Sequence, residues 1–249
     1  MRKILAFETK EEFALHEELI SRLSDRLTEY QQLLIENYAL TELPKGVIWT
    51  SEELATSVFS EIPIPAYTNE NFIYITPDLE AWKRIFSKQL DGKDLPEIDK
   101  FYEKNLESEL LVILAHELTH HSDWFIDEFG DERNNSIWFE EGMCFYLPRK
   151  LLLNESEFDE ITQVETALVQ EFYDQYGNHS LDDFGSESYF GSLSSIMFDY
   201  WRSYLKVKEL VEDWANHDIN KVFAEYHKWN REGRKLPLTE YFRLKQSNN

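Results

Sequence analysis

The stretch that most constrains the fold is a run of six apolar residues, LLVILA at 110–115, that leads directly into HELTHH at 116–121. A helix with apolar residues all round is stable only when it is buried. In such a helix His116 and His120 are four positions apart, so their imidazoles project from the same face, one turn from each other. The sequence therefore predicts a buried helix that presents a pair of nitrogen ligands.

The composition predicts a folded globular protein. The chain has 249 residues, of which 42% are hydrophobic and 15% aromatic. A chain of this length can bury a large core as one domain or as two lobes that share a cleft. We expect a single domain over 1–249, with approximate lobes 1–123 and 124–249.

The charge excludes some classes of partner. With a formal net charge of −23, the chain lacks the basic face that nucleic acid or an anionic membrane surface requires. The charge serves solubility, with a preference for basic substrates as the alternative. A lone cysteine, Cys144, excludes an intrachain disulfide and a thiolate metal cage.

The sequence favours a cytoplasmic location. The start, MRKILAFE, holds only five apolar residues before Glu8, fewer than the roughly seven to fifteen of a secretory signal. No window approaches the roughly 18 apolar residues of a membrane span, so no membrane partner is expected.

Periodicity predicts an α+β protein that is mostly helical, with a small N-terminal mixed sheet and a helical C-terminal lobe. Apolar residues at helical spacing predict a helix from Lys10 to about Tyr38. Prolines at 63 and 65 exclude a central strand there. The other expected elements are strands at 47–50 and 71–77, helices at 78–90, 96–123 and 136–153 (ended or kinked near Pro148), a charged loop at 127–135, and helices over 155–249 broken at 176–185 and 231–237.

The histidine pair predicts a metal centre, because two imidazoles aimed at one point suit Zn²⁺. Glu117 lies about 100° round the helix from His116, where a general base can reach the open side of the metal without coordinating it. A catalytic zinc usually has a third protein ligand. The segment WFEEG at 138–142 offers Glu140 and Glu141, and helix geometry alone does not separate these neighbours.

HELTH followed by WFEEG resembles the gluzincin metallopeptidases, the group of thermolysin and the zinc aminopeptidases. The resemblance implies a zincin-like catalytic domain with one Zn²⁺ per chain, held by His116, His120 and Glu141. It gives Glu117 the role of the base that activates water, and it ranks Glu140 below Glu141, which directly precedes the glycine.

Further roles are implied only by this resemblance. Trp138 and Gly142 match the framework of the third-ligand segment, where glycine lets the helix approach the zinc helix closely. Tyr189, shortly before Gly191, matches the tyrosine that stabilises the oxyanion, although its spacing is one residue shorter, and the alternative is a core aromatic. Strand 71–77 matches the edge strand that binds the substrate backbone.

The match to the family is incomplete. The Gly-x-Met-Glu-Asn exopeptidase motif is absent, so recognition of a free N-terminus is not supported. Phe145 stands where thermolysin-like enzymes carry an aspartate four residues after the third ligand. His179 is a weaker match to the histidine that donates to the reaction intermediate in those enzymes.

The sequence thus predicts a zinc-dependent peptidase acting on a peptide or protein substrate through a metal-activated water, with Glu117 as general base and Tyr189 as a second catalytic residue. The alternative is an inactive peptidase-like zinc protein that acts as a binding or regulatory module. A helical interaction protein with a coincidental HExxH is a third reading. His121 is expected to be a partly exposed neighbour, Asp123 a solvated acid at the helix end, Cys144 a small buried hydrophobe, and the C-terminal aromatic residues to pack helices together.

Overall fold

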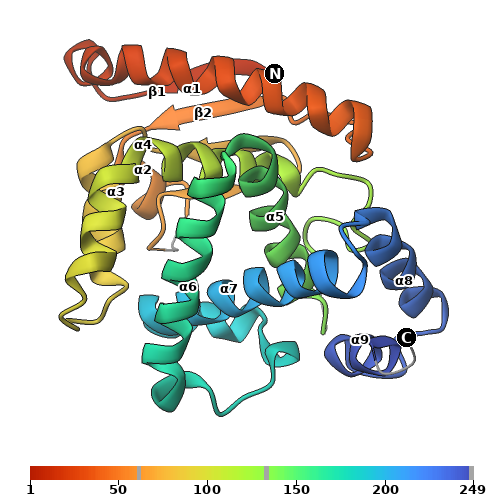
Figure 1. Ribbon diagram of the computed structural model, residues 1–249. Coiled ribbons are helices and arrows are strands. Elements are labelled where there is room, and N and C mark those ends of the chain that lie inside the picture. Colours follow the sequence, from red (N-terminus) through yellow and green to blue (C-terminus); the bar gives the residue numbers. More distant parts are fainter. Residues whose placement is uncertain (61–62, 132–134, 247–249) are drawn as a thin grey trace. The chain divides into compact units, whose positions relative to one another are not determined.

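The computed structural model describes residues 1–60, 63–131 and 135–246, which Figure 1 traces in colour from the N-terminus to the C-terminus. It is mostly helical (65%) with a small four-stranded mixed sheet, which confirms the predicted class of α+β, mostly helical. The expected loop at 127–135 includes residues 132–134, which lie outside the described residues.

The chain divides into two compact units. The first comprises Met1–Asp123 and Leu147–Leu153, and the second comprises Trp124–Tyr146 and Asn154–Asn249. The expectation of one domain over 1–249 with lobes 1–123 and 124–249 stays a prediction. In chain order the first unit holds β1 (Arg2–Ala6), α1 (Lys10–Asn37), β2 (Gly46–Thr50), α2 (Glu52–Ser57), β3 (Ala66–Thr68), β4 (Phe72–Ile75), α3 (Leu79–Lys88) and α4 (Pro96–Thr119).

The sheet has the strand order β1-β2-β4-β3. β2 pairs in parallel with β1 and with β4, and β3 pairs antiparallel with β4. β2 and β4 confirm the strands predicted at 47–50 and 71–77. The prediction that 71–77 forms an edge strand is wrong, because β4 has a neighbour on both sides and the antiparallel edge is β3. β3 follows Pro65 directly, which agrees with the exclusion of proline from central strands.

α1 holds the end of α4 in place. Tyr30 and Thr119, both fully buried, join their hydroxyl oxygens in a 2.7 Å hydrogen bond. Thr119 Oγ1 also lies 2.7 Å from the carbonyl oxygen of Ala115, to which it donates, so Tyr30 is the donor to Thr119. Ser122 Oγ donates to the carbonyl oxygen of Tyr38 at 2.5 Å. These bonds fix the turn that carries the two histidines.

α4 differs from its prediction at its C-terminus. It ends at Thr119 with His120 as the cap, whereas the sequence predicted a helix to about Asp123. The chain leaves the helix because the backbone N–H of Asp123 donates to the carbonyl oxygen of Ala39 at 3.0 Å instead of to its own helix. α4 is also interrupted at Asn105, whose φ of −111° and ψ of 15° are not helical.

The second unit is built from helices around aromatic side chains. Phe139 stacks on Tyr226 with ring centroids 4.3 Å apart and also contacts Phe223 and Phe242, so the prediction that C-terminal aromatic residues pack helices together is confirmed. The elements are most of α5 (Ile137–Leu152), α6 (Glu155–Tyr176), η1 (Leu181–Asp183), η2 (Ser186–Phe190), α7 (Leu193–Glu209), η3 (Leu210–Trp214), α8 (Ile219–Arg231) and α9 (Leu238–Gln246).

Two further predictions can be compared with these elements. The helix breaks at 176–185 and 231–237 are confirmed by the intervals between α6 and α7 and between α8 and α9. The end or kink expected near Pro148 is wrong as an end, because α5 continues through this proline to Leu152. Among the described residues, none of the helices has both the length and the apolarity that crossing a membrane demands.

Candidate metal site

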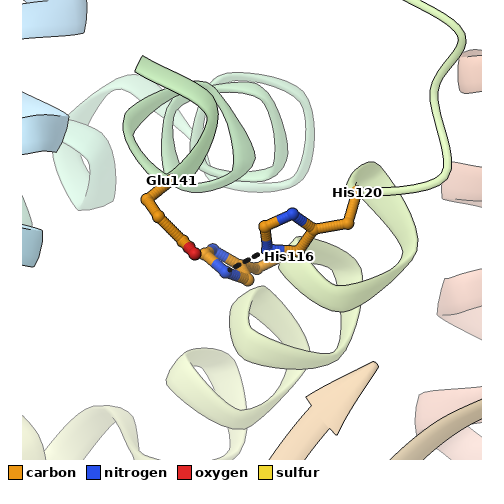
Figure 2. Close-up of side chains that lie close together, drawn as sticks. All are labelled: His116, His120 and Glu141. Carbon is orange, nitrogen blue, oxygen red and sulfur yellow. Dashed lines mark hydrogen bonds between the residues drawn. The ribbon is translucent and has the colours of Figure 1, made fainter. Parts of the chain in front are cut away.

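α4 presents the two predicted nitrogen ligands. Its second half is buried by the apolar run at 110–115, and His116 itself is only 4% exposed. His120 lies just past the helix end, yet its φ of −55° and ψ of −20° remain helical. Its ring therefore stays on the face of His116. The two Nε2 atoms are 3.0 Å apart, as the dashed line in Figure 2 shows.

α5 presents the third ligand, and the structure separates the two glutamates that the sequence left open. Glu141 points toward the imidazoles in Figure 2, and it belongs to the same cluster of ligand atoms as His116 and His120. Glu140 is buried elsewhere, where its carboxylate is among the charges that, after burial itself, raise the pKa of Tyr226. Of the two neighbours, Glu141 is therefore the one that meets the histidines.

Together these three residues can hold a metal ion. One ligand atom of each of His116, His120 and Glu141 lies within 4.8 Å of the others (Figure 2). His116 and Glu141 are buried, and His120 is half-buried. Burial strengthens the attraction between such a donor set and a cation, because little water competes for either. Among the residues that the structure describes, His116, His120 and Glu141 are the histidine, cysteine or acidic side chains found close enough together to hold a metal ion.

Gly142 has a role that the sequence did not predict. A Cβ atom on this residue would lie 2.4 Å from the carbonyl oxygen of Ser203 and 2.6 Å from Val207 Cγ2, both on α7. The glycine therefore lets α5 approach α7. The expectation that it serves contact with the zinc helix is thereby corrected.

Tyr189 lies beside the third ligand. Its hydroxyl is 3.4 Å from Glu141 Oε1, to which it donates, and 2.8 Å from the hydroxyl of Tyr200. Tyr189 is half-buried, which differs from the fully buried state of a simple core aromatic. Its role in stabilising an oxyanion stays a prediction.

Glu117 is 8% exposed, between the two histidines in the sequence and on the same helix. It is not one of the three residues whose ligand atoms converge. This agrees with the expectation that it does not coordinate the metal. Its role as general base stays a prediction.

Two residues beyond the histidine pair, His121 and Asp123, contact side chains outside the metal cluster. His121 Nε2 lies 2.8 Å from Thr68 Oγ1 on the edge strand β3. Burial, followed by the proximity of His120, lowers the pKa of His121 to about 4. Asp123 accepts a hydrogen bond from the Thr41 hydroxyl. His121 is half-buried and Asp123 is exposed, as the sequence predicted.

His179, between α6 and η1, is bound to a separate polar group on α7. Its Nε2 atom is 2.8 Å from Asp199 Oδ1, and Arg202 Nη1 donates to the same oxygen at 3.2 Å. Burial raises the pKa of Asp199, and the charges of His179 and Arg202 act in the opposite direction. Donation by His179 to a reaction intermediate stays a prediction. Cys144 is buried.

Sequence reasoning missed two residues that contact predicted residues of the site, Tyr189 and Trp138. Tyr200 binds Tyr189, and no sequence signal marks it, because the pairing depends on how α7 meets η2. Asp182 accepts bonds of 3.1 Å from Trp138 Nε1 and from the backbone N–H of Thr239 at the start of α9. The helix-start pattern Ser180-x-Asp182 marks a local turn but gives no hint of the contact with Trp138.

A scan against protein-family models found no match for this chain, and searches of curated proteins and of solved structures found none either. What the site can do therefore follows from the chemistry of its own side chains.

Proposed function

We propose that this chain is a zinc-dependent peptidase whose catalytic domain is zincin-like and of gluzincin type. The observation that carries the proposal is the convergence of ligand atoms from His116, His120 and Glu141 within 4.8 Å. It joins two segments that sequence motifs had singled out separately. A cytoplasmic site of action and a peptide or protein substrate are parts of the same proposal.

The donor set supports zinc as the metal. Two imidazole nitrogens and one carboxylate oxygen are the ligands of many catalytic zinc sites, which leave a further position open. Two nitrogens bonded to a tetrahedral zinc are about 3.3 Å apart. The two Nε2 atoms here are 3.0 Å apart. The limit of 4.8 Å for the whole set is wider.

When bound, zinc supplies Lewis acidity that activates water near neutral pH and polarises a carbonyl oxygen. The chain's own residues supply the remaining chemistry. The Glu117 carboxylate accepts a proton from the attacking water and passes it to the leaving amine nitrogen. The Tyr189 hydroxyl, whose single proton is directed at Glu141 in the free chain, turns to donate it to the oxyanion that develops on the substrate. Burial of Glu117 limits competing water at its carboxylate.

Replacement of Glu117 by glutamine tests the mechanism. We expect Glu117→Gln to lose peptide hydrolysis by at least about 100-fold, the lower range for general acid–base catalysis, while it still binds one zinc per chain. Hydrolysis is measured on a peptide library, and zinc is measured by elemental analysis of the same samples. Glu107→Gln, at a surface position of α4 paired with Arg22, is the matched control and should keep both properties.

The outcomes separate the alternatives. Unchanged hydrolysis in Glu117→Gln would remove the mechanism. One zinc per chain without turnover of any peptide by the unmodified chain would assign it to the inactive, peptidase-like class of binding proteins. A chain purified with ample zinc that retains none would leave the HExxH as a coincidence.

A further inference from the structure

Three polar groups form a chain of hydrogen bonds that ends on the third ligand. Tyr200 on α7 has its hydroxyl 2.8 Å from that of Tyr189 on η2, and Tyr189 is 3.4 Å from Glu141 Oε1 on α5. Glu141, Tyr189 and Tyr200 all belong to the second unit. The 2.8 Å contact has ordinary hydrogen-bond length, and the 3.4 Å contact is longer.

The chemistry of the groups fixes the direction of donation. An ionised carboxylate only accepts hydrogen bonds, so the contact with Glu141 requires the proton of Tyr189. A tyrosine hydroxyl has one proton, and Tyr189 then has only lone pairs to offer to its other neighbour. Tyr200 must therefore donate to Tyr189. The chain runs from Tyr200 through Tyr189 to Glu141, and each donation polarises the next in the same sense.

Packing holds both tyrosine rings in this arrangement. Phe184 contacts both of them, with ring centroids 5.9 Å from Tyr189 and 5.2 Å from Tyr200. Phe145 on α5 meets Tyr200 edge-on at 5.8 Å. Phe145 is one turn beyond Glu141 on the same helix. The ring that supports Tyr200 and the carboxylate that accepts the hydrogen bond from Tyr189 therefore move together.

We propose that Tyr200 is a positioning residue for the third metal ligand, acting through Tyr189 on the Glu141 carboxylate. This proposal rests on the proposed function, because it requires Glu141 to bind metal. Hydrogen bonds to a metal-binding carboxylate fix its orientation, and their loss typically weakens metal affinity by about 10- to 100-fold.

The test measures zinc affinity by competition with a chromophoric chelator, using zinc alone as the probe. We expect Tyr200→Phe to raise the dissociation constant for zinc by about tenfold, and Tyr189→Phe to raise it at least as much, because Tyr189 touches the carboxylate directly. Tyr204→Phe is the matched control. Tyr204 is one turn further along α7 and loses a comparable bond, of 2.7 Å to Thr162 Oγ1 on α6, which involves neither Tyr189 nor Glu141. Its zinc affinity should match that of the unmodified chain.

A double-mutant cycle separates positioning from a general structural effect. In the Tyr189→Phe background, Tyr200→Phe should have no further effect on zinc affinity, since the chain of hydrogen bonds is already broken. Melting of the zinc-free variants, followed by circular dichroism, should be alike for Tyr200→Phe and Tyr204→Phe.

Each outcome of the experiment bears on a distinct proposal. Unchanged zinc affinity in Tyr200→Phe would overturn the positioning role of Tyr200 and leave the zinc site standing. Equal losses in the presence and absence of Tyr189 would also overturn it, because Tyr200 would then act by another route. Failure of the unmodified chain to bind zinc would overturn both proposals.

Discussion

Glu140 and Glu141, adjacent on α5, face different surroundings because successive residues of a helix point about 100° apart. Glu141 joins the imidazoles of His116 and His120, whereas Glu140 lies near enough to Tyr226 to raise its pKa. Both are at most 5% exposed, so burial does not distinguish them. Direction along the helix decides which of the two is the ligand.

This difference predicts that the same substitution has different effects on zinc affinity at the two positions. Glu141→Gln should weaken zinc binding by more than about 100-fold, because a neutral amide replaces a charged carboxylate. This loss exceeds the range for residues that only support a ligand. Glu140→Gln should bind zinc within a few-fold of the unmodified chain. Chelator competition measures both. Equal zinc affinity in the two variants would contradict the assignment of Glu141.

The residues of the site were predictable to different degrees. The histidine pair follows from spacing within one helix, so the sequence alone sufficed for His116 and His120. Glu141 required a motif, since helix spacing could not choose between it and Glu140. Tyr200 was missed because its partner, Tyr189, is brought to it only by the packing of α7 against its neighbours.

At the scale of elements, the contact between α5 and α7 depends on one missing side chain. At Gly142 a methyl group would lie 2.4 Å from the carbonyl oxygen of Ser203, a backbone atom that cannot rotate away. The helices would have to move apart along the segment that carries Glu141 and Tyr200. The second unit should be sensitive to this substitution in stability as well as in its site.

We therefore expect Gly142→Ala to lower the free energy of unfolding by about 1–3 kcal/mol, the usual cost of overpacking. Urea denaturation followed by circular dichroism measures it. Gly185→Ala is the control, because its backbone is extended and a Cβ atom there meets only Asp183 O at 3.8 Å. It should stay within about 0.5 kcal/mol of the unmodified chain. Equal stability of the two variants would show that α5 and α7 tolerate separation.

The helices were the more predictable elements. α1, α3 and α6 are long enough for apolar periodicity to mark them. β1 and β3 were missed because each is a short strand at an edge of the sheet, where few residues are buried and alternation is weak. The end of α4 was misplaced because the Asp123–Ala39 hydrogen bond, which redirects the chain, joins residues far apart in sequence.

At the scale of the whole molecule, zinc binding should stabilise the fold. A ligand that binds only the folded state adds about 2.7 kcal/mol when its free concentration is 100-fold above its dissociation constant. Glu141 is distant in sequence from the two histidines, and an unfolded chain does not hold it near them. Binding is therefore coupled to folding.

The expected result is a higher melting temperature with zinc than with a chelator for the unmodified chain. Glu141→Gln should show a much smaller difference, since its zinc site is incomplete. Differential scanning calorimetry measures both at matched ionic strength, because the net charge of −23 makes stability sensitive to salt. A zinc effect of equal size in both variants would mean that the metal stabilises the chain from elsewhere.

The interruption of α4 at Asn105 insulates the ligand face from changes upstream. In an unbroken helix, insertion of one residue rotates everything beyond it by about 100°. At Asn105 the backbone already departs from the helix, and its side chain amide, donating to Phe101 O at 3.0 Å, caps the preceding turn. An insertion or deletion in the first half of α4 can be absorbed at Asn105. Such a change then leaves the direction of the two imidazoles unchanged.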